Sequence, residues 1–325
     1  MTRSDKWLAV VVLAQALTTS LHAQPAYPAG PITIVVPMAA GGTSDMVARV
    51  LARSMQDSLK QPVIISNRAG ATGLIGSKAV QRSKPDGYTL LFTGVSTLVT
   101  SAMLQNPVPF DAVKDFSPVA RAVDYPLFIM TGSGNKARNL QQLVEEAKQK
   151  SGGLTQATPG VGSISHLACE AFSSAAGVSL RVIPYNSTRA AKQALLSNET
   201  DVGCMSEEGV AAFVADGRIR LIAALSPNRD AGSPNVPTAI EAGYPGLTAS
   251  VWQGLFAPKG TPVEVINKLH HSLQSALRTT EMVEFARAQS LRIINEESAE
   301  AESGVRADQE KWARVIKEKN IVLKD

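Results

Sequence analysis

The loop at residues 40–45 carries the residue types of this chain that are best suited to bind an anion. It reads Ala40-Gly41-Gly42-Thr43-Ser44-Asp45, and it joins an apolar run at 32–36 to apolar residues at helical spacing. The glycines let the backbone turn sharply and expose N–H groups, and Thr43 and Ser44 add hydroxyls. Such N–H groups at a helix N-terminus attract anions, because the helix dipole is positive there. On this segment alone, an ordinary strand-to-helix loop is an equally good interpretation.

The elements around this loop predict a parallel sheet. Strands are expected at 32–36, 62–65 and 88–92, with helices between them over 47–59 and 74–82. This alternation is typical of a sheet with helices on both faces. Ligands of such sheets bind beyond the carboxyl ends of the strands. The loops at 40–44 and 93–96, each following a strand, can therefore face one pocket.

A second alternating unit follows, and the chain then changes character. Strands are expected at 127–131, 154–157, 181–183, 201–204 and 220–225, and the strand at 154–157 runs into another glycine-rich loop, 158–163. The tail holds a strand at 251–257 and two amphipathic helices, whose apolar faces must pack against another part of the chain. We therefore expect the chain to return to the first unit, giving a discontinuous lobe 1 (24–124 plus 229–325) and a lobe 2 (125–228).

The N-terminus and the charge balance indicate an exported protein that does not bind nucleic acid. Arg3 and Lys6 precede an apolar stretch at 7–17, and Ala23 offers a small residue for cleavage. These features predict a signal peptide over 1–23, since the apolar stretch is too short to span a bilayer. With 32 Lys and Arg against 28 Asp and Glu and no basic run interleaved with aromatics, a nucleic-acid partner is not expected.

Catalytic and metal-binding patterns are not found in the sequence, and no cofactor is expected. Gly160-Val161-Gly162-Ser163-Ile164-Ser165 lacks the last glycine of a nucleophile elbow, and no H-E-x-x-H occurs. Cys169 and Cys204 could pair in an oxidising compartment. Two buried free thiols in neighbouring elements are the favoured interpretation. The adjacent acids Glu207 and Glu208 are interpreted as complementing a helix dipole.

Six segments in order give the chain a resemblance to the Bug-type periplasmic solute receptors of the tripartite tricarboxylate transporter family. The resemblance covers essentially the whole chain after the signal peptide. The segments begin with Ile32-Thr33-Ile34-Val35-Val36-Pro37 with Gly41-Gly42-Thr43-Ser44-Asp45, and continue with Asn67-Arg68-Ala69-Gly70-Ala71-Thr72-Gly73, Pro85-Asp86-Gly87-Tyr88-Thr89-Leu90, Gly160-Val161-Gly162-Ser163 with His166-Leu167, Pro237-Thr238-Ala239-Ile240-Glu241-Ala242-Gly243 and Trp252-Gln253-Gly254-Leu255-Phe256-Ala257-Pro258. The chain departs from the family where it reads Pro184-Tyr185-Asn186-Ser187 and Ser197-Asn198-Glu199-Thr200.

The resemblance implies a fold and a function. The fold is a two-lobed, type II periplasmic-binding-protein-like α/β fold, in which each lobe is a mostly parallel sheet flanked by helices. Such a receptor is a monomer in the periplasm that closes on a small carboxylate and meets a membrane permease transiently. A sensor receptor that reports ligand occupancy to a membrane partner is an alternative with the same pocket. A periplasmic enzyme acting on an organic acid is a third, less favoured alternative.

The resemblance also implies site residues, position by position. The carboxylate loop of lobe 1 would be Ala40, Gly41, Gly42 and Thr43, with Asp45 bracing the helix start. A second loop of that lobe would contribute Thr93 and Gly94. Lobe 2 would supply Thr158, Gly160, Gly162, Ser163, His166 and Asp201. Several short hydrogen bonds from neutral donors stabilise a carboxylate well without an arginine clamp.

Overall fold

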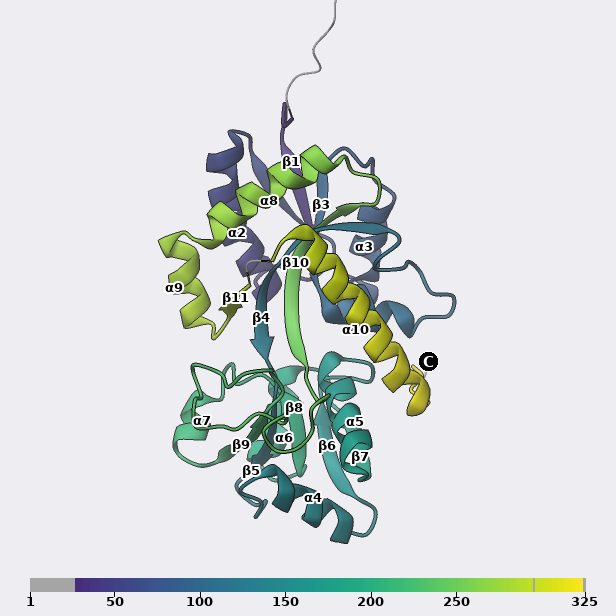
Figure 1. Ribbon diagram of the computed structural model, residues 1–325, viewed down its shortest axis with the longest axis vertical. Helices are drawn as coiled ribbons and strands as arrows, with labels where there is room; N and C mark the ends of the chain where they lie inside the picture. The colour runs from purple at the N-terminus through teal and green to yellow at the C-terminus, as the bar shows by residue number, and fades with distance from the viewer. Residues whose placement is uncertain (1–26, 295, 324–325) are drawn as a thin grey trace, which may run out of the picture.

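The protein consists of two β-sheets, one above the other, each flanked by helices (Figure 1). The computed structural model describes residues 27–294 and 296–323. The signal peptide predicted for residues 1–23 lies outside the described residues. The arrangement confirms the predicted two-lobed α/β fold, but both sheets are mixed and not mostly parallel, because antiparallel pairs are at least as frequent as parallel ones in each. Within the described part, no helix combines the length and the apolar character needed to cross a bilayer.

Sheet A is built around three parallel strands. Its order in the described residues is β11-β4-β10-β3-β1-β2. β1 pairs in parallel with β2 and β3, whereas β10 runs antiparallel to both β3 and β4. The strands are β1 (Ile32–Val36), β2 (Val63–Asn67), β3 (Thr89–Gly94), β4 (Phe116–Pro126), β10 (Ser250–Pro258) and β11 (Arg292–Ile293).

Helices cover both faces of sheet A because its strands are apolar on both sides. Ile32 and Ile34 pack with α2 (Thr43–Leu59) and α8 (Val263–Leu277). Val35 and Leu91 point the other way and join the cluster of α3 (Leu74–Gln81) and α10 (Ser298–Glu318). Successive side chains of a strand alternate between faces, so both layers are fixed by the same short strands. The shorter helices of this half are η1 (Ala71–Gly73), η2 (Ser96–Ser101) and α9 (Thr280–Ala288).

Sheet B repeats the spatial arrangement of the strands of sheet A, although its fourth strand, β5, comes first in the chain and its counterpart β10 comes late. Its order is β7-β6-β8-β5-β9, with β6, β7 and β8 parallel and β5 antiparallel to β8 and β9. This matches the order β2-β1-β3-β10-β4 of sheet A, so the loop after β6 is equivalent to the loop after β1. The elements are β5 (Phe128–Gly132), α4 (Leu140–Gln149), β6 (Leu154–Thr158), α5 (Ile164–Ala176), β7 (Leu180–Pro184), α6 (Thr188–Leu196), β8 (Val202–Met205), α7 (Ala211–Ala215) and β9 (Ile219–Ala224).

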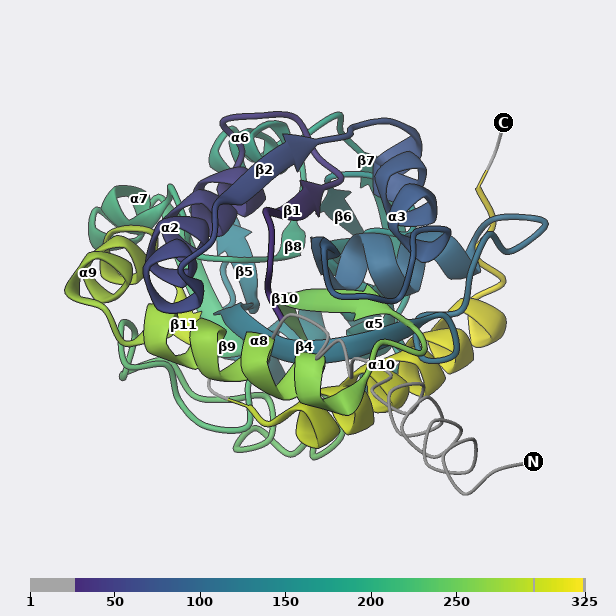
Figure 2. The same cartoon turned by 90° about the horizontal axis from the view of Figure 1, so that it is seen from above.

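The chain passes between the sheets twice, from β4 to β5 and from β9 to β10. The predicted lobe boundary at residues 124 and 125 falls inside β4, which ends at Pro126. Helix α10 reaches from sheet A to helix α5 beside sheet B. Ser298 at its start donates to the Pro118 carbonyl of β4 (2.5 Å), and Lys319, directly after its end, donates to the Ser173 hydroxyl of α5 (2.8 Å). Seen from above, α10 lies on the side of the molecule away from α2 and α6 (Figure 2).

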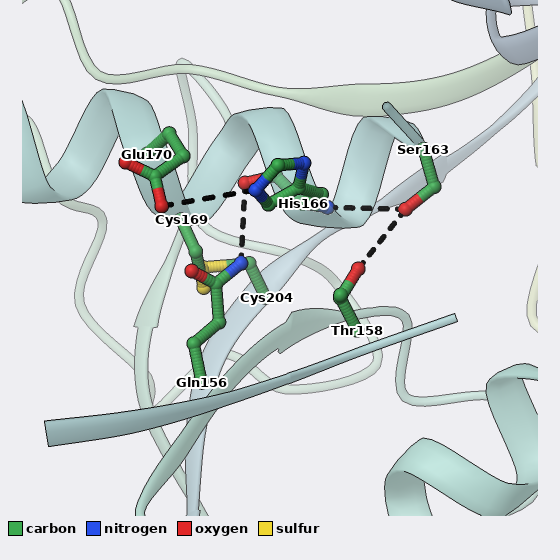
Figure 3. Close-up of a disulfide and its surroundings, with 7 residues drawn as sticks. All are labelled: Gln156, Thr158, Ser163, His166, Cys169, Glu170 and Cys204. Carbon is green, nitrogen blue, oxygen red and sulfur yellow. Dashed lines mark hydrogen bonds and ion pairs between the residues drawn. A yellow bond between two sulfur atoms is a disulfide. The ribbon is translucent and has the colours of Figure 1, made fainter. Parts of the chain in front are cut away.

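Cys169 and Cys204 form a disulfide, so the expectation of two free thiols is wrong. Their Cα atoms are 5.5 Å apart, and both residues are fully buried (Figure 3). The bond is possible because α5 packs against β8 and brings the two positions face to face within the usual Cα separation of a disulfide. The two cysteines are 35 positions apart in the sequence, and no local pattern indicated this contact.

Candidate ligand-binding site

The start of α2 is organised by the buried carboxylate of Asp45. Gly41 donates its backbone N–H to Asp45 at 2.9 Å, and Asn67 and Arg49 donate at 2.9 and 3.0 Å. Burial opposes ionisation, but the hydrogen bonds from Arg49, Gly41 and Asn67 outweigh it and lower the pKa of Asp45 to about 2. Asp45 is therefore ionised, and its carboxylate holds the loop in place. The Gly41 N–H already donates to this carboxylate.

Gly42 is the N-cap of α2, and no side chain caps the helix there. The first N–H groups of the helix have no partner within it, so those of Thr43 and Ser44 are available to an anion. Gly42, Thr43 and Ser44 all line a pocket between the two sheets. The positive φ required in this turn belongs to Gly41, at 82°.

The start of α5 is held by an internal network. The Ser163 hydroxyl accepts from the His166 N–H (3.2 Å), donates to the Gly160 carbonyl (2.8 Å) and lies 3.1 Å from the Thr158 hydroxyl (Figure 3). Gly160 and Gly162 have φ values of 131° and 80°, which disfavour other residues. Ser165, on the first turn of α5, lines the same pocket as Gly42.

His166 supports this loop from within. It is 3 % exposed, and its Nδ1 accepts the N–H of Gly162 at 3.0 Å. Burial lowers its pKa to about 4, so the imidazole is neutral at pH 7 and Nδ1 stays an acceptor. The ring Nε2 lies 3.8 Å from Glu170. The structure therefore places His166 behind the loop and not among the residues that line the pocket.

A third helix, α6, also begins at the pocket. The Ser187 hydroxyl caps it by accepting from the Ala190 N–H at 3.2 Å, and Thr188 on its first turn lines the pocket. The departure from the family pattern at 184–187 thus supplies the cap of this helix. Three helix N-termini, one from the half with sheet A and two from the half with sheet B, meet at one cavity.

The pocket has a volume of about 260 Å³. This lies below the roughly 300–1,000 Å³ of pockets for drug-sized ligands, so a small solute fits it. Its floor is formed by the strands that cross between the sheets. The lining residues are Met38, Gly42, Thr43, Ser44, Tyr125, Leu127, Ser165, Thr188, Ser206, Glu208, Val251 and Gln253.

Two buried polar atoms of this lining lack a hydrogen-bond partner among the described residues. They are the Tyr125 hydroxyl and the Oε1 of Gln253, in residues that are 5 % and 6 % exposed. Val251 pairs with Tyr125 across β4 and β10, and Gln253 follows two residues later on the same face. Buried polar groups are nearly always paired in proteins. Both residues line the pocket, where a bound solute can contact them, and although burial raises the pKa of Tyr125, the nearby side chains of Thr43 and Gln253 lower it in part.

The structure brings only part of the predicted set to this pocket. Gly42 and Thr43 line it, and Ala40 and Gly41 lie in the loop beside them. Thr158, Gly160, Gly162 and Ser163 shape the start of α5 from behind. Thr93 pairs with Gly254, and its side chain points away from the face of Gln253. A Cβ at Gly94 would lie 2.5 Å from the Trp252 carbonyl, so Gly94 permits close strand packing.

Asp201 lies at the other end of sheet B. Its carboxylate accepts from the N–H and the hydroxyl of Thr155, both at 2.7 Å, and from Lys150 at 2.6 Å. Thr155 is near the start of β6, whereas the pocket lies past the end of that strand. Asp201 therefore ties β8 to β6 and is not brought to the pocket.

Several lining residues were not identified from the sequence. Tyr125 and Gln253 sit on the two crossing strands, and only their pairing across the fold reveals them. Ser165 lies two residues after the predicted loop 158–163, and Thr188 directly follows the capping residue Ser187, so helix-start signals could have found both. Glu208 was interpreted as a helix-dipole partner, but it precedes a helix of five residues and lines the pocket.

Comparison with known proteins identifies the family. The sequence profile described as "tripartite tricarboxylate transporter family receptor" matches residues 47–321. The chain belongs to this receptor family. BugT of Bordetella pertussis is 34% identical over 325 residues, which is 100% of this chain and 99% of BugT. The protein is accordingly a periplasmic solute-binding receptor, and its family consists of receptors, not enzymes.

Solved structures of similar proteins contain carboxylates. MatC from Rhodopseudomonas palustris with bound malate is 28% identical, has a TM-score of 0.73, and the match covers 89% of this receptor and 100% of MatC. The R. palustris protein Rpa4515 with adipate is 25% identical with a TM-score of 0.75, over 91% of this receptor and 99% of Rpa4515.

Proposed function

We propose that this receptor captures a small organic carboxylate between its two lobes and delivers it to a membrane transporter. The observation that carries the proposal is the meeting of the N-termini of α2, α5 and α6 at one pocket. Each contributes N–H groups and a positive dipole end, which together replace the hydration of a carboxylate. The malate and adipate in related structures support the same ligand chemistry.

The predicted binding loops divide into residues that touch the ligand and residues that hold the loops. Gly42, Thr43 and Ser44 approach it from one lobe, and Ser165 and Thr188 approach it from the other. Thr158, Gly160, Gly162, Ser163 and Asp45 keep the two loops in shape. A ligand that bridges both lobes favours the closed arrangement, because it makes both sets of contacts only there.

A binding screen tests the proposal. The mature chain, from residue 24 onward, is partly unfolded and refolded to release any retained solute, and its melting temperature is then measured with aliphatic, aromatic and amino carboxylic acids. A ligand at about a hundred times its dissociation constant adds roughly 2.7 kcal/mol, which raises the melting temperature by several degrees. Selective stabilisation by one acid supports the proposal. A flat response to all acids contradicts it.

Delivery to a transporter needs a separate experiment. Uptake of the identified acid is compared in cells with the wild-type receptor and cells with a Thr43→Val, Thr188→Val variant, which loses a hydroxyl on each side of the pocket. Uptake should fall with the loss of binding. Binding that leaves uptake unchanged while altering gene expression would favour the sensor alternative instead.

A further inference from the structure

Lys192 is a buried cation beside the ligand pocket. It lies on α6 four residues after Thr188, so both residues face the same side of this helix. Lys192 is only 7 % exposed, and its ammonium donates to the backbone carbonyl of Glu208. Its side chain lines a cavity of about 410 Å³ that adjoins the ligand pocket, since Thr188 and Glu208 line both. The ammonium is therefore held at the border between the two cavities.

Glu208 is the reason why the ligand pocket needs a cation at this border. Among the described residues, it is the one acidic residue that lines the pocket. The neighbouring Glu207 differs, because its carboxylate accepts from the Ser233 hydroxyl at 2.7 Å and it is not part of the pocket lining. An uncompensated carboxylate in the lining would repel a carboxylate solute, since like charges at close range destabilise each other in a partly buried site.

The ammonium of Lys192 compensates this acid. Burial lowers the pKa of Lys192 to about 8, and the negative charges of Glu208 and Glu207 limit the fall. The amine and the two acids therefore interact electrostatically although no ion pair joins them directly. At pH 7 the amine carries its proton, and it loses this proton near pH 8. The compensation is thus present at neutral pH and absent at alkaline pH.

Few other charges face the amine. The strands on which α6 packs, β5, β6 and β8, have no charged side chain within their bounds. Arg189, on the first turn of α6, lines the same cavity as Lys192. Phe213 also lines this cavity, and Arg218 stacks on its ring and pairs with Asp216 at 2.7 Å. The charge beside the ligand pocket is therefore set mainly by the amine and the acid described above.

We propose that Lys192 is a positioning residue of this receptor, which neutralises Glu208 and holds its segment so that a carboxylate can bind beside that acid. The proposal rests on the function proposed above, because it assumes that the helix starts hold a carboxylate. It makes capture of the solute depend on the protonation of a lysine that does not itself line the ligand pocket.

Substitutions of the pair test the compensation of charge. The probes are malate and adipate or, if neither binds, the acid that stabilises the chain most in the screen above, and calorimetry gives the dissociation constants. Lys192→Met keeps the length of the side chain but not its charge, and should weaken binding about 10- to 100-fold at pH 7. Adding Glu208→Gln should restore most of the affinity, because it removes the uncompensated acid. Adding Glu207→Gln instead removes an equal charge outside the pocket lining and should restore much less.

A pH profile distinguishes the charge of Lys192 from a merely structural contact. In the wild type, the dissociation constant should be level from pH 6 to 7 and rise as the pH passes about 8, where Glu208 is left uncompensated. Lys192→Met has no proton to lose in this range, so its profile should be flat. In Glu208→Gln the midpoint should move to lower pH, because a negative charge that raises the pKa of Lys192 is gone.

The outcomes separate this proposal from the proposed function. Wild-type affinity of Lys192→Met overturns the role of Lys192, and so does a loss of affinity that Glu208→Gln does not restore. If Lys192→Met does not fold, the profiles of the wild type and Glu208→Gln decide, and a wild-type profile without weakening above pH 8 overturns the proposal. Failure of every acid of the screen to bind the wild type overturns the proposed function itself.

Discussion

Gly162 donates its backbone N–H to the Nδ1 of His166 at 3.0 Å, which locks the loop at the start of α5. The imidazole can accept this bond only while Nδ1 is unprotonated. Burial keeps it so, because it lowers the pKa of His166 from 6.5 to about 4. The loop that supports one side of the pocket thus depends on a neutral histidine.

This histidine gives the stability a defined pH dependence. Below pH 6.5 the unfolded chain takes up a proton on His166, whereas the folded chain does so only near pH 4, so stability is lost as the pH falls through this window. The loss is on the order of 3 kcal/mol. His166→Asn offers an acceptor that does not titrate. Denaturant unfolding between pH 7 and 4 should therefore show a shallower slope for this variant.

Two carboxyl groups help to interpret that measurement. The raised pKa of Glu170, which is caused by burial, works in the opposite direction but is common to both proteins. The stability contributed by Asp45 is lost only below its ordinary pKa of 3.8, outside this window. Identical pH slopes for wild type and His166→Asn would contradict the assigned role of His166.

Gly42→Val should block the approach of the anion to the start of α2. Gly42 has an ordinary φ of −77°, and a Cβ there meets nothing closer than 3.5 Å, so the fold should be retained. Binding should weaken about 10- to 100-fold, because the added methyl groups stand between the ligand and the N–H groups. Gly30→Val, also at an open position, is the control. Unchanged affinity of Gly42→Val would exclude this loop from the site.

Tyr125→Phe should separate stability from binding. The Tyr125 hydroxyl has no partner of good hydrogen-bond geometry among the described residues, although Thr43 and Gln253 lie close enough to oppose the rise that burial causes in its pKa, so its removal should change the unliganded stability little. Ligand affinity should fall, because the bound solute loses a partner. The control Tyr27→Phe removes a hydroxyl that donates to the Gly87 carbonyl at 2.8 Å. It should cost about 1 kcal/mol of stability and leave binding intact, as calorimetry and melting curves would show.

Gly162→Ala should destabilise the contact between the lobes. A Cβ at Gly162 would lie 2.1 Å from a methyl of Leu104, whereas one at Gly160 meets nothing within 4 Å. Both positions have positive φ, so both alanine variants should lose about 1–2 kcal/mol from backbone strain. Gly162→Ala should lose a further ~1–3 kcal/mol from the clash. A double-mutant cycle with Leu104→Ala measures that second part, and a zero coupling energy would refute it.

The disulfide should contribute to stability but not to ligand selection. Cys169 and Cys204 close a loop of 35 residues within one lobe. Replacing both by alanine should cost about 2–4 kcal/mol, as is typical of native disulfides. The two residues are buried between α5 and β8 and do not line the pocket. The ligand preference of the variant, measured below its lowered melting temperature, should match that of the wild type.

The sequence predicted the repeated strand–helix units well because their strands are short apolar runs followed by loops of small residues. It did not predict β4, which is the longest strand among the described residues. Arg121 and Asp124 interrupt the apolar pattern there. Their charges are paired by residues far along the chain: Arg121 by Glu296 and Asp308, and Asp124 by Arg292. No local pattern reports partners at such a distance in sequence.

The same limit applies to the candidate site. Gly42 and Thr43 could be found because a glycine-rich helix start has a local signature. Tyr125 and Gln253 become neighbours only when β4 pairs with β10, and neither has a local pattern that marks it as functional. Glu208 has the additional difficulty that its neighbour Glu207 is of the same type but is bonded to Ser233. Only the three-dimensional arrangement distinguishes the two acids.

The position of α10 determines how a solute can reach the pocket. Hydrogen bonds link its start to Pro118 and the residue after its end to Ser173. The helix therefore connects the two lobes along one side of the molecule. A rotation that parts the lobes must leave the bridged side closed. Helices α2 and α6, whose starts line the pocket, lie on the opposite side (Figure 2). We therefore expect a single entrance, so that solute enters and leaves by the same route.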